Sequence, residues 1–225
     1  TSTKSLWYYL TVIAMAKKKN MKVMLYSNGI GPLERKGNIK KTKKILDKVD
    51  LITLRDERSY KTLREIGIEN KNVKVTADPA LDLDIADEKL GKTILKNEGV
   101  PSDKKLLGVS VRKWQNLGSD FETQIANACD YAYEKYGYYT VFLPMQSSRD
   151  TAIMQNIKRK MKHESAIIKK RYSVEEMLSI IKCFDMCIGM RLHTLIYAAI
   201  NSVPLIGLVY DPKINSFMEY THQRH

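Results

Sequence analysis

Arg191 and His193 stand where an apolar strand gives way to a helix. Residues 186–189 form a short apolar run, and from Leu192 onward apolar residues recur at the spacing of one helical face. Unpaired backbone N–H groups and the macrodipole favour an anion at a helix N-terminus. A guanidinium and an imidazole there suit anion binding and proton transfer. Spacing alone also allows a structural pair, in which Arg191 caps a carbonyl and His193 is a hydrogen-bonded boundary residue.

Three further cations follow predicted strands: Arg55, Arg112 and Lys213. The carboxyl ends of parallel strands are where open α/β sheets bind ligands, and arginine there suits bidentate capture of carboxylate or phosphate. We therefore predict that these residues bind an anionic substrate. Arg55 has a structural alternative, since it can pair with Asp56, Glu57 or Asp78.

The segment SNGIGP, residues 27–32, is predicted to be a loop after a strand. Gly29 and Gly31 allow its backbone to approach a ligand closely or simply to turn. The segment lacks the third glycine of a dinucleotide fingerprint and the Lys-Ser/Thr end of a P-loop. Arg35 follows, where it can contact an anion bound at the turn or belong to a solvated basic loop.

The loop that begins at Met145 and Gln146 follows another predicted strand. Together with Ser147 it offers amide and hydroxyl groups that suit a sugar, although such loops are common without function. We note it as a weaker candidate for substrate contact.

The composition is that of a globular protein with 225 residues, 44% of them hydrophobic. The apolar run at residues 7–16 is shorter than the roughly 20 residues that span a bilayer, so it is predicted to be a buried helix. No signal-peptide cleavage pattern follows it. The three cysteines have no metal-ligand spacing, and Cys129 lies on an apolar helical face, so they are predicted to be reduced residues of a cytoplasmic protein.

The net charge of +13, from 38 basic and 25 acidic residues, predicts an anionic partner. The lysine runs at 17–19 and 40–44 contain no aromatic residues, and no zinc-finger or RNA-binding signature is present. Nucleic acid is therefore less favoured than a phosphorylated substrate or an anionic membrane face. A lysine-rich solvated surface is the alternative.

Alternating strands and helices predict parallel sheets in two Rossmann-like lobes. A polar, charged stretch at residues 82–104 marks the boundary, which divides the chain into 1–95 and 96–225. Ser173 and Glu176 have the spacing of a capping box. The predicted strands are 22–26, 51–54, 74–76, 106–111, 140–143, 165–168, 186–189 and 204–210, and the main helices are 38–46, 57–65, 121–136 and 151–161.

The segment GMRLHTLIYAAINSVPLIGLVYDPKI, residues 189–214, resembles the signature of the polysaccharide pyruvyl transferase family, bacterial ketal-forming enzymes of the cell-wall anchoring type. Further matches lie in the family's order along nearly the whole chain. They are YSNGIGPL at 26–33, LITLRDERSY at 51–60, ADPAL at 77–81 and GVSVRKW at 108–114.

This resemblance implies a GT-B-like fold, with two lobes facing a cleft, and phosphoenolpyruvate as donor without a metal or other cofactor. His193 is then the general acid or base. The substrate-binding residues are Arg191, Lys213, Arg112, Arg35, Arg55, Gly29 and Gly31. Family members have a glycine-rich strand before the position of Thr1 and further helices after Tyr220, so we expect the chain to be truncated at both ends.

The implied acceptor is a lipid-linked saccharide containing N-acetylmannosamine, used at the cytoplasmic membrane face for a secondary cell-wall polymer that anchors surface-layer proteins. The alternatives are a nucleotide-sugar glycosyltransferase on the same scaffold and a basic, non-catalytic scaffold that docks on anionic lipid or wall polymer. Because Arg191 and His193 both border the apolar stripe, replacing either is expected to cost little stability.

Overall fold

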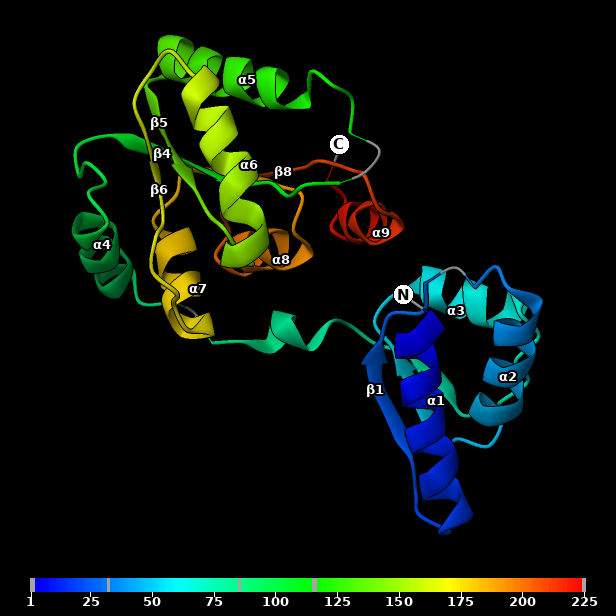
Figure 1. Cartoon of the computed structure of the whole chain (residues 1–225). Helices are drawn as coiled ribbons and strands as arrows, with labels where there is room; N and C mark the ends of the chain where they lie inside the picture. Colours follow the sequence, from blue (N-terminus) through cyan, green and yellow to red (C-terminus); the bar gives the residue numbers. More distant parts are fainter. Residues whose placement is uncertain (1–2, 32, 85, 115–116, 224–225) are drawn as a thin grey trace. The chain divides into compact units, whose positions relative to one another are not determined.

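The computed structural model describes residues 3–31, 33–84, 86–114 and 117–223. The chain forms two compact units, Thr1–Pro79 and Ala80–His225. Both are α/β units with parallel strands, as the alternating pattern predicts (Figure 1). Several predicted elements have the observed bounds, and others differ by a few residues at their ends.

The first unit contains a three-stranded parallel sheet in the order β1-β2-β3. Strand β1 continues to Asn28, so Ser27 and Asn28 belong to the strand and not to the predicted loop, because pairing with β2 extends to Asn28 opposite Leu54. Pro32 lies outside the described residues. The elements are α1 (Thr3–Lys18), β1 (Met24–Asn28), α2 (Lys36–Leu46), β2 (Leu51–Leu54), α3 (Glu57–Glu65) and β3 (Val73–Val75).

Helix α1 is not the buried helix that its composition predicts. Only Leu10 and Ile13 are buried, whereas Trp7, Tyr8, Tyr9, Val12 and Met15 are exposed. One stripe of the helix packs on the small core of the first unit, and this leaves the rest of its apolar surface outside. In the described part of the chain, no helix has the length and apolar character required to cross a bilayer.

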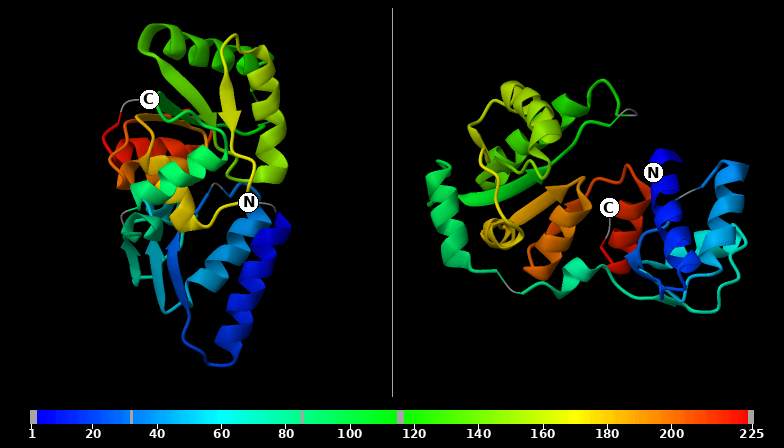
Figure 2. Two further views of the ribbon diagram at one scale, coloured as in Figure 1. Left: turned by 90° about the vertical axis from the view of Figure 1, so that its left-hand side faces the viewer. Right: turned by 60° about the horizontal axis from the view of Figure 1, so that its bottom comes forward.

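The second unit contains a five-stranded parallel sheet in the order β6-β5-β4-β7-β8. Helices α5 and α6 cover one face, and α4, α7, α8 and α9 cover the other, so the sheet is doubly wound (Figures 1 and 2). The elements are η1 (Pro79–Asp82, which crosses from the first unit), α4 (Glu88–Asn97), β4 (Lys105–Ser110), α5 (Phe121–Tyr136), β5 (Tyr138–Phe142), α6 (Ser147–Lys160), β6 (Ser165–Ile167), α7 (Val174–Lys182), β7 (Met186–Gly189), α8 (Leu192–Ile200), β8 (Leu205–Gly207) and α9 (Pro212–Tyr220).

The boundary between the units lies at Pro79/Ala80, earlier than the predicted division at 95/96. Helix α4 therefore belongs wholly to the second unit. Its residues Ile94 and Leu95 are part of that unit's core, and Gly91 lies against α7. The polar composition of residues 82–104 marks a solvated surface of α4 rather than a linker.

We predict that Gly91→Ala destabilises the protein by about 1–3 kcal/mol, the usual cost of overpacking. A Cβ at Gly91 would lie 2.0 Å from the carbonyl oxygen of Ser179, so α4 must move away from α7. Urea unfolding measures the change. Gly37→Ala in α2 is the control because its Cβ would meet open space, and helix propensity alone then favours alanine. Equal stabilisation by both substitutions would contradict the close packing of α4 on α7.

Candidate functional site

The loops that follow the five strands of the second unit lie at one edge of its sheet. From β4 the chain adds β5 and β6 on one side and then returns to place β7 on the other side of β4. This reversal makes the β4/β7 boundary the switch point, where doubly wound sheets bind ligands. Arg112 follows β4, and Arg191 and His193 follow β7. The sequence-predicted residues of this unit therefore flank the expected ligand position.

Arg191 is bound to a buried carboxylate. Its Nε donates to Oδ2 of Asp150 at 3.0 Å, its Nη2 donates to Oδ1 of the same residue, and Nη2 also donates to Oε1 of Gln146 at 3.2 Å. Asp150 is fully buried, and its Oδ2 also accepts from the backbone N–H of Gln146 at 2.9 Å. Arg191 thus holds one orientation and is locally neutralised. Its Nη1 group has no hydrogen-bond partner among the described residues.

This ion pair corrects the expectation that replacing Arg191 costs little stability. Without the guanidinium, the Asp150 carboxylate would lie buried and unpaired, which is strongly unfavourable. Sequence reasoning did not identify Asp150 as a site residue. A signal was present, because Asp150 begins the apolar stripe of α6 that continues through Ile153, Met154 and Ile157. A carboxylate on such a stripe needs a buried partner.

His193 lies in the first turn of α8 and is exposed. Its ring centroid is 6.1 Å from that of Tyr197, one turn further along. Within the described residues its ring makes no hydrogen bond, which argues against the alternative of a hydrogen-bonded boundary histidine. The imidazole is accessible for proton exchange with a ligand bound at this edge.

Arg112 belongs to a cation–aromatic cluster with Trp114 and Tyr210. The guanidinium carbon lies 5.2 Å from the Trp114 ring centroid and 5.9 Å from that of Tyr210, and Nη1 lies 3.5 Å from the Tyr210 hydroxyl. Burial raises the pKa of Tyr210, and the charges of Arg112 and Arg191 act in the opposite direction. The loops after β4 and β7 therefore bring two arginines near one hydroxyl. The buried Nε of Arg112 has no hydrogen-bond partner in the described part of the chain.

Lys213 lies in the first turn of α9. Asp211 caps this helix, since its Oδ1 accepts from the backbone N–H of Lys213 at 3.0 Å. The Lys213 ammonium lies 3.7 Å from Oδ2 of Asp211 and is partly exposed. Such an ion pair is weak, so the ammonium remains available to an anionic ligand.

Arg55 in the first unit has the predicted structural partners. Its Nη1 lies 3.1 Å from Oδ2 of Asp78, and its Nε lies 3.6 Å from Oδ2 of Asp56. Gly29 makes room for this side chain, because a Cβ there would lie 2.8 Å from Nε of Arg55. The loop glycine therefore has a packing role that the sequence did not indicate.

The other candidates of the first unit have few contacts. A Cβ at Gly31 would meet no atom within 4 Å, so packing does not require a glycine there. Arg35 is exposed, and its Nη1 donates to the Thr3 hydroxyl at 3.3 Å. A substrate-binding role for Arg35, Arg55, Gly29 and Gly31 remains a prediction.

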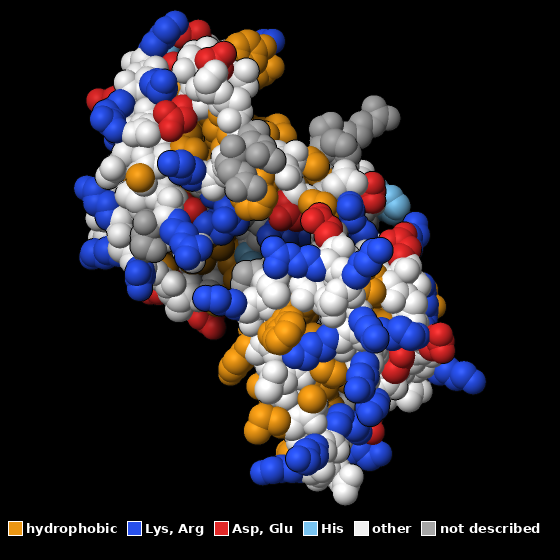
Figure 3. Space-filling view, turned by 45° about the vertical axis from the view of Figure 1, so that its right-hand side comes forward, with side chains coloured by type: hydrophobic (Ala, Val, Ile, Leu, Met, Phe, Trp, Pro, Cys, Tyr) orange, Lys and Arg blue, Asp and Glu red, His pale blue; other side chains and the backbone are white. Residues whose placement is uncertain are grey.

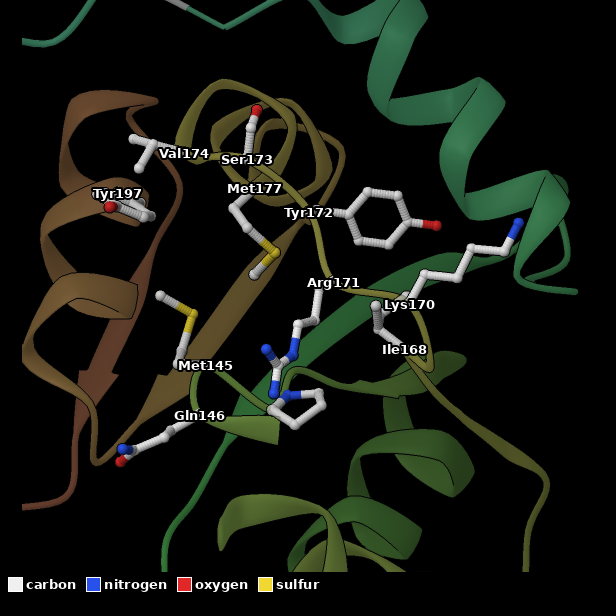
Figure 4. A pocket seen from close by; sticks show the side chains of 11 residues that line it. Met145, Gln146, Ile168, Lys170, Arg171, Tyr172, Ser173, Val174, Met177 and Tyr197 are labelled. Carbon is white, nitrogen blue, oxygen red and sulfur yellow. The ribbon is translucent and has the colours of Figure 1, made fainter. Parts of the chain in front are cut away.

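A pocket of about 480 Å³ lies at the carboxyl ends of β5 and β6, beside α7 and α8 (Figure 4). Met145 and Gln146, which were candidates for sugar contact, both line it, whereas the side chain of Ser147 lies outside what the structure describes. The complete lining is Pro144, Met145, Gln146, Ile168, Lys170, Arg171, Tyr172, Ser173, Val174, Met177 and Tyr197.

The cysteine thiols are poor nucleophiles. Burial raises the pKa of Cys129 and of Cys183 to about 11 and that of Cys187 to about 12, so the reactive thiolate is scarce near neutral pH. Among the described residues, no three His, Cys, Asp or Glu side chains are grouped so that they could hold a metal ion.

A doubly wound sheet with cations at its switch point is typical of enzymes that bind anionic ligands. Comparison with solved structures identifies the fold class of the chain. The chain is similar to S. aureus MnaA in a co-structure with UDP (13% identity, TM-score 0.69, covering 99% of this chain and 67% of that one). It is also similar to a putative UDP-N-acetylglucosamine 2-epimerase from Listeria monocytogenes (10% identity, TM-score 0.66, covering 96% of this chain and 57% of that one). A third similar structure is UDP-GlcNAc 2-epimerase from Methanocaldococcus jannaschii with UDP-GlcNAc and UDP (17% identity, TM-score 0.62, covering 95% of this chain and 59% of that one).

These similarities define a GT-B-type α/β fold and confirm the predicted fold class. The chain spans 57% to 67% of the length of these three proteins. It belongs to the polysaccharide pyruvyl transferase family, whose family model matches residues 1–212. No curated protein sequence matches the chain significantly.

Proposed function

We propose that the protein transfers the pyruvyl group of phosphoenolpyruvate to two hydroxyls of one sugar and forms a cyclic ketal. The observation that carries this proposal is the gathering of Arg112 and Arg191 near Tyr210, with the exposed His193 on the same sheet edge. Family membership supports the transferase class. This donor requires several cations and a proton-transfer group, and the sheet edge offers arginines, a lysine and an imidazole.

Phosphoenolpyruvate is a small trianion, so its binding site needs both positive charge and oriented donors. Arg191 is neutralised by Asp150 and therefore contributes mainly the directed N–H groups of Nη1. Arg112 and Lys213 supply the excess positive charge. The guanidinium of Arg112 suits a carboxylate or phosphate oxygen of the donor.

The proposed reaction moves two protons. The first sugar hydroxyl adds to the enol carbon and loses its proton, while the methylene carbon gains a proton and becomes a methyl group. The carbon–oxygen bond to phosphate then breaks, with its electron pair leaving on phosphate. The second hydroxyl adds to the same carbon, and its proton leaves on the released phosphate. His193 transfers the proton to the methylene or removes it from a hydroxyl.

The proposed acceptor is a lipid-linked saccharide with an N-acetylmannosamine unit, in the synthesis of a secondary cell-wall polymer that anchors surface-layer proteins. The proposed location is the cytoplasm, at the inner membrane face. Figure 3 shows many Lys and Arg side chains at the surface, and the net charge of +13 suits a diphospholipid carrier and anionic lipid. The reaction as proposed uses phosphoenolpyruvate without a further cofactor and without nucleic acid.

The second candidate function is a nucleotide-sugar glycosyltransferase. The observation behind it is that two solved structures of the same fold contain UDP or UDP-GlcNAc. Fold similarity at this identity does not carry a substrate from one protein to another.

Thermal unfolding with each donor separates the two functions. Phosphoenolpyruvate at about 100 times its Kd should stabilise the protein by about 2.7 kcal/mol, whereas UDP-GlcNAc should leave the unfolding temperature unchanged. Release of inorganic phosphate should require both phosphoenolpyruvate and a saccharide with two free hydroxyls. Stabilisation by UDP-GlcNAc but not by phosphoenolpyruvate would reject the pyruvyl transfer in favour of the glycosyltransferase.

A further inference from the structure

The pocket at the carboxyl ends of β5 and β6 has an apolar wall and a positive charge. Met145, Val174, Met177 and Tyr197 lie around it, and the guanidinium of Arg171 extends toward Met145 (Figure 4). The side chain of Lys170 points away from Met145 in the same view. None of the lining residues carries a carboxylate. The pocket therefore suits a ligand with an anionic end and an uncharged body that fills the space over the apolar wall.

Hydrogen bonds to Glu98 hold the loop that carries Arg171 in place. The Glu98 carboxylate accepts from the backbone N–H groups of Lys169 at 2.9 Å and Lys170 at 3.1 Å, and from the Tyr172 hydroxyl at 2.8 Å. Burial opposes ionisation of Glu98, but these hydrogen bonds outweigh it and lower its pKa. The loop then enters α7 through the capping box predicted at Ser173. The pocket is thus preformed, which reduces the ordering cost of binding.

The pocket adjoins the proposed reaction site at two points. Gln146 lines it and also accepts a hydrogen bond from Arg191. Tyr197 lines it, and its ring is the neighbour of the His193 ring on α8. A molecule that fills the pocket therefore lies beside Gln146 and Tyr197, the neighbours of Arg191 and His193.

Phosphoenolpyruvate fits this pocket poorly, because it is charged at both ends and has no uncharged body to cover the methionines and Tyr197. A pyranose ring covers such a wall with its C–H face and can reach Gln146 with its hydroxyls. A phosphate on the same sugar matches the Arg171 guanidinium.

We propose that this pocket binds a glycosyl phosphate, as the phosphate-bearing end of the acceptor saccharide. The role of this ligand as acceptor rests on the proposed function. The assignment of a glycosyl phosphate as the ligand class rests on the lining of the pocket. Arg171 is then a specificity residue that distinguishes phosphorylated from neutral saccharides.

Isothermal titration with two ligands tests the assignment. N-acetylmannosamine 1-phosphate should bind the full chain at least about tenfold more tightly than the methyl glycoside of the same sugar, as expected for a hydrogen bond to a charged group. Arg171→Gln should remove this difference. Lys169→Gln is the matched control, since it removes the same charge from the same loop at a residue that does not line the pocket. Neither substitution should alter the thermal shift caused by phosphoenolpyruvate.

Three results would overturn the assignment. The first is equal affinity for the phosphate and the methyl glycoside. The second is loss of the phosphoenolpyruvate shift in Arg171→Gln with glycosyl phosphate binding intact, which would make the pocket the donor site. The third is competition by UDP for the same Arg171-dependent binding, which would assign the pocket to a nucleoside diphosphate. The titration needs no turnover, so a protein that does not bind phosphoenolpyruvate fails the proposed function without deciding the occupant of the pocket.

Discussion

Replacing His193 with glutamine is expected to lower turnover by about 10²–10⁴-fold, the usual contribution of a general acid or base. Glutamine keeps a polar side chain of similar reach at the first turn of α8 but cannot exchange a proton near neutral pH. The KM for phosphoenolpyruvate should change little, because the cations of the site remain. The unfolding temperature should also change little, since His193 is exposed.

Steady-state kinetics of phosphate release measure the His193 effect. His163→Gln is the matched control, because His163 stacks on Tyr133 with ring centroids 4.1 Å apart and pairs with Glu134, away from the sheet edge of the site. It should leave turnover intact. If His193→Gln retains turnover, or if it unfolds the protein, His193 has a structural role and proton transfer belongs to another group.

Arg191→Ala is expected to affect both stability and donor binding. Removing one partner of a buried ion pair costs about 3–5 kcal/mol, because an uncompensated charge remains. Here that charge is the fully buried Asp150 carboxylate. Loss of the Nη1 donors should also raise the KM for phosphoenolpyruvate about tenfold or more.

The double variant Arg191→Ala/Asp150→Asn separates these two effects. It removes the charge that Arg191→Ala leaves unpaired, so it should recover much of the lost stability, as measured by urea unfolding. Its KM should stay high, because the donors to the substrate are still missing. Recovery of both stability and KM would contradict a direct contact between Arg191 and the donor. Recovery of neither would contradict the charge argument for Asp150.

The sequence by itself determined the elements whose signals are local. The strand at 51–54, the helices at 57–65 and 121–136 and the strand at 186–189 have the predicted bounds, because side-chain periodicity and terminal residues act within a few positions. It also placed Arg191 and His193 at a strand-to-helix junction. That junction is visible in one segment, because a short apolar run gives way there to apolar residues at helical spacing. The parallel sheets follow from the alternation of strands and helices.

Only the tertiary structure decided which of these residues meet. Asp150 and Arg191 are 41 positions apart, and Arg112 and Tyr210 are 98 apart. Both contacts exist because the return of the chain after β6 places β7 beside β4, an order that no local pattern encodes. The exposure of α1 and the assignment of α4 to the second unit likewise depend on the partner that each helix packs against. An apolar or charged run shows what a segment can contact, and the strand order decides what it does contact.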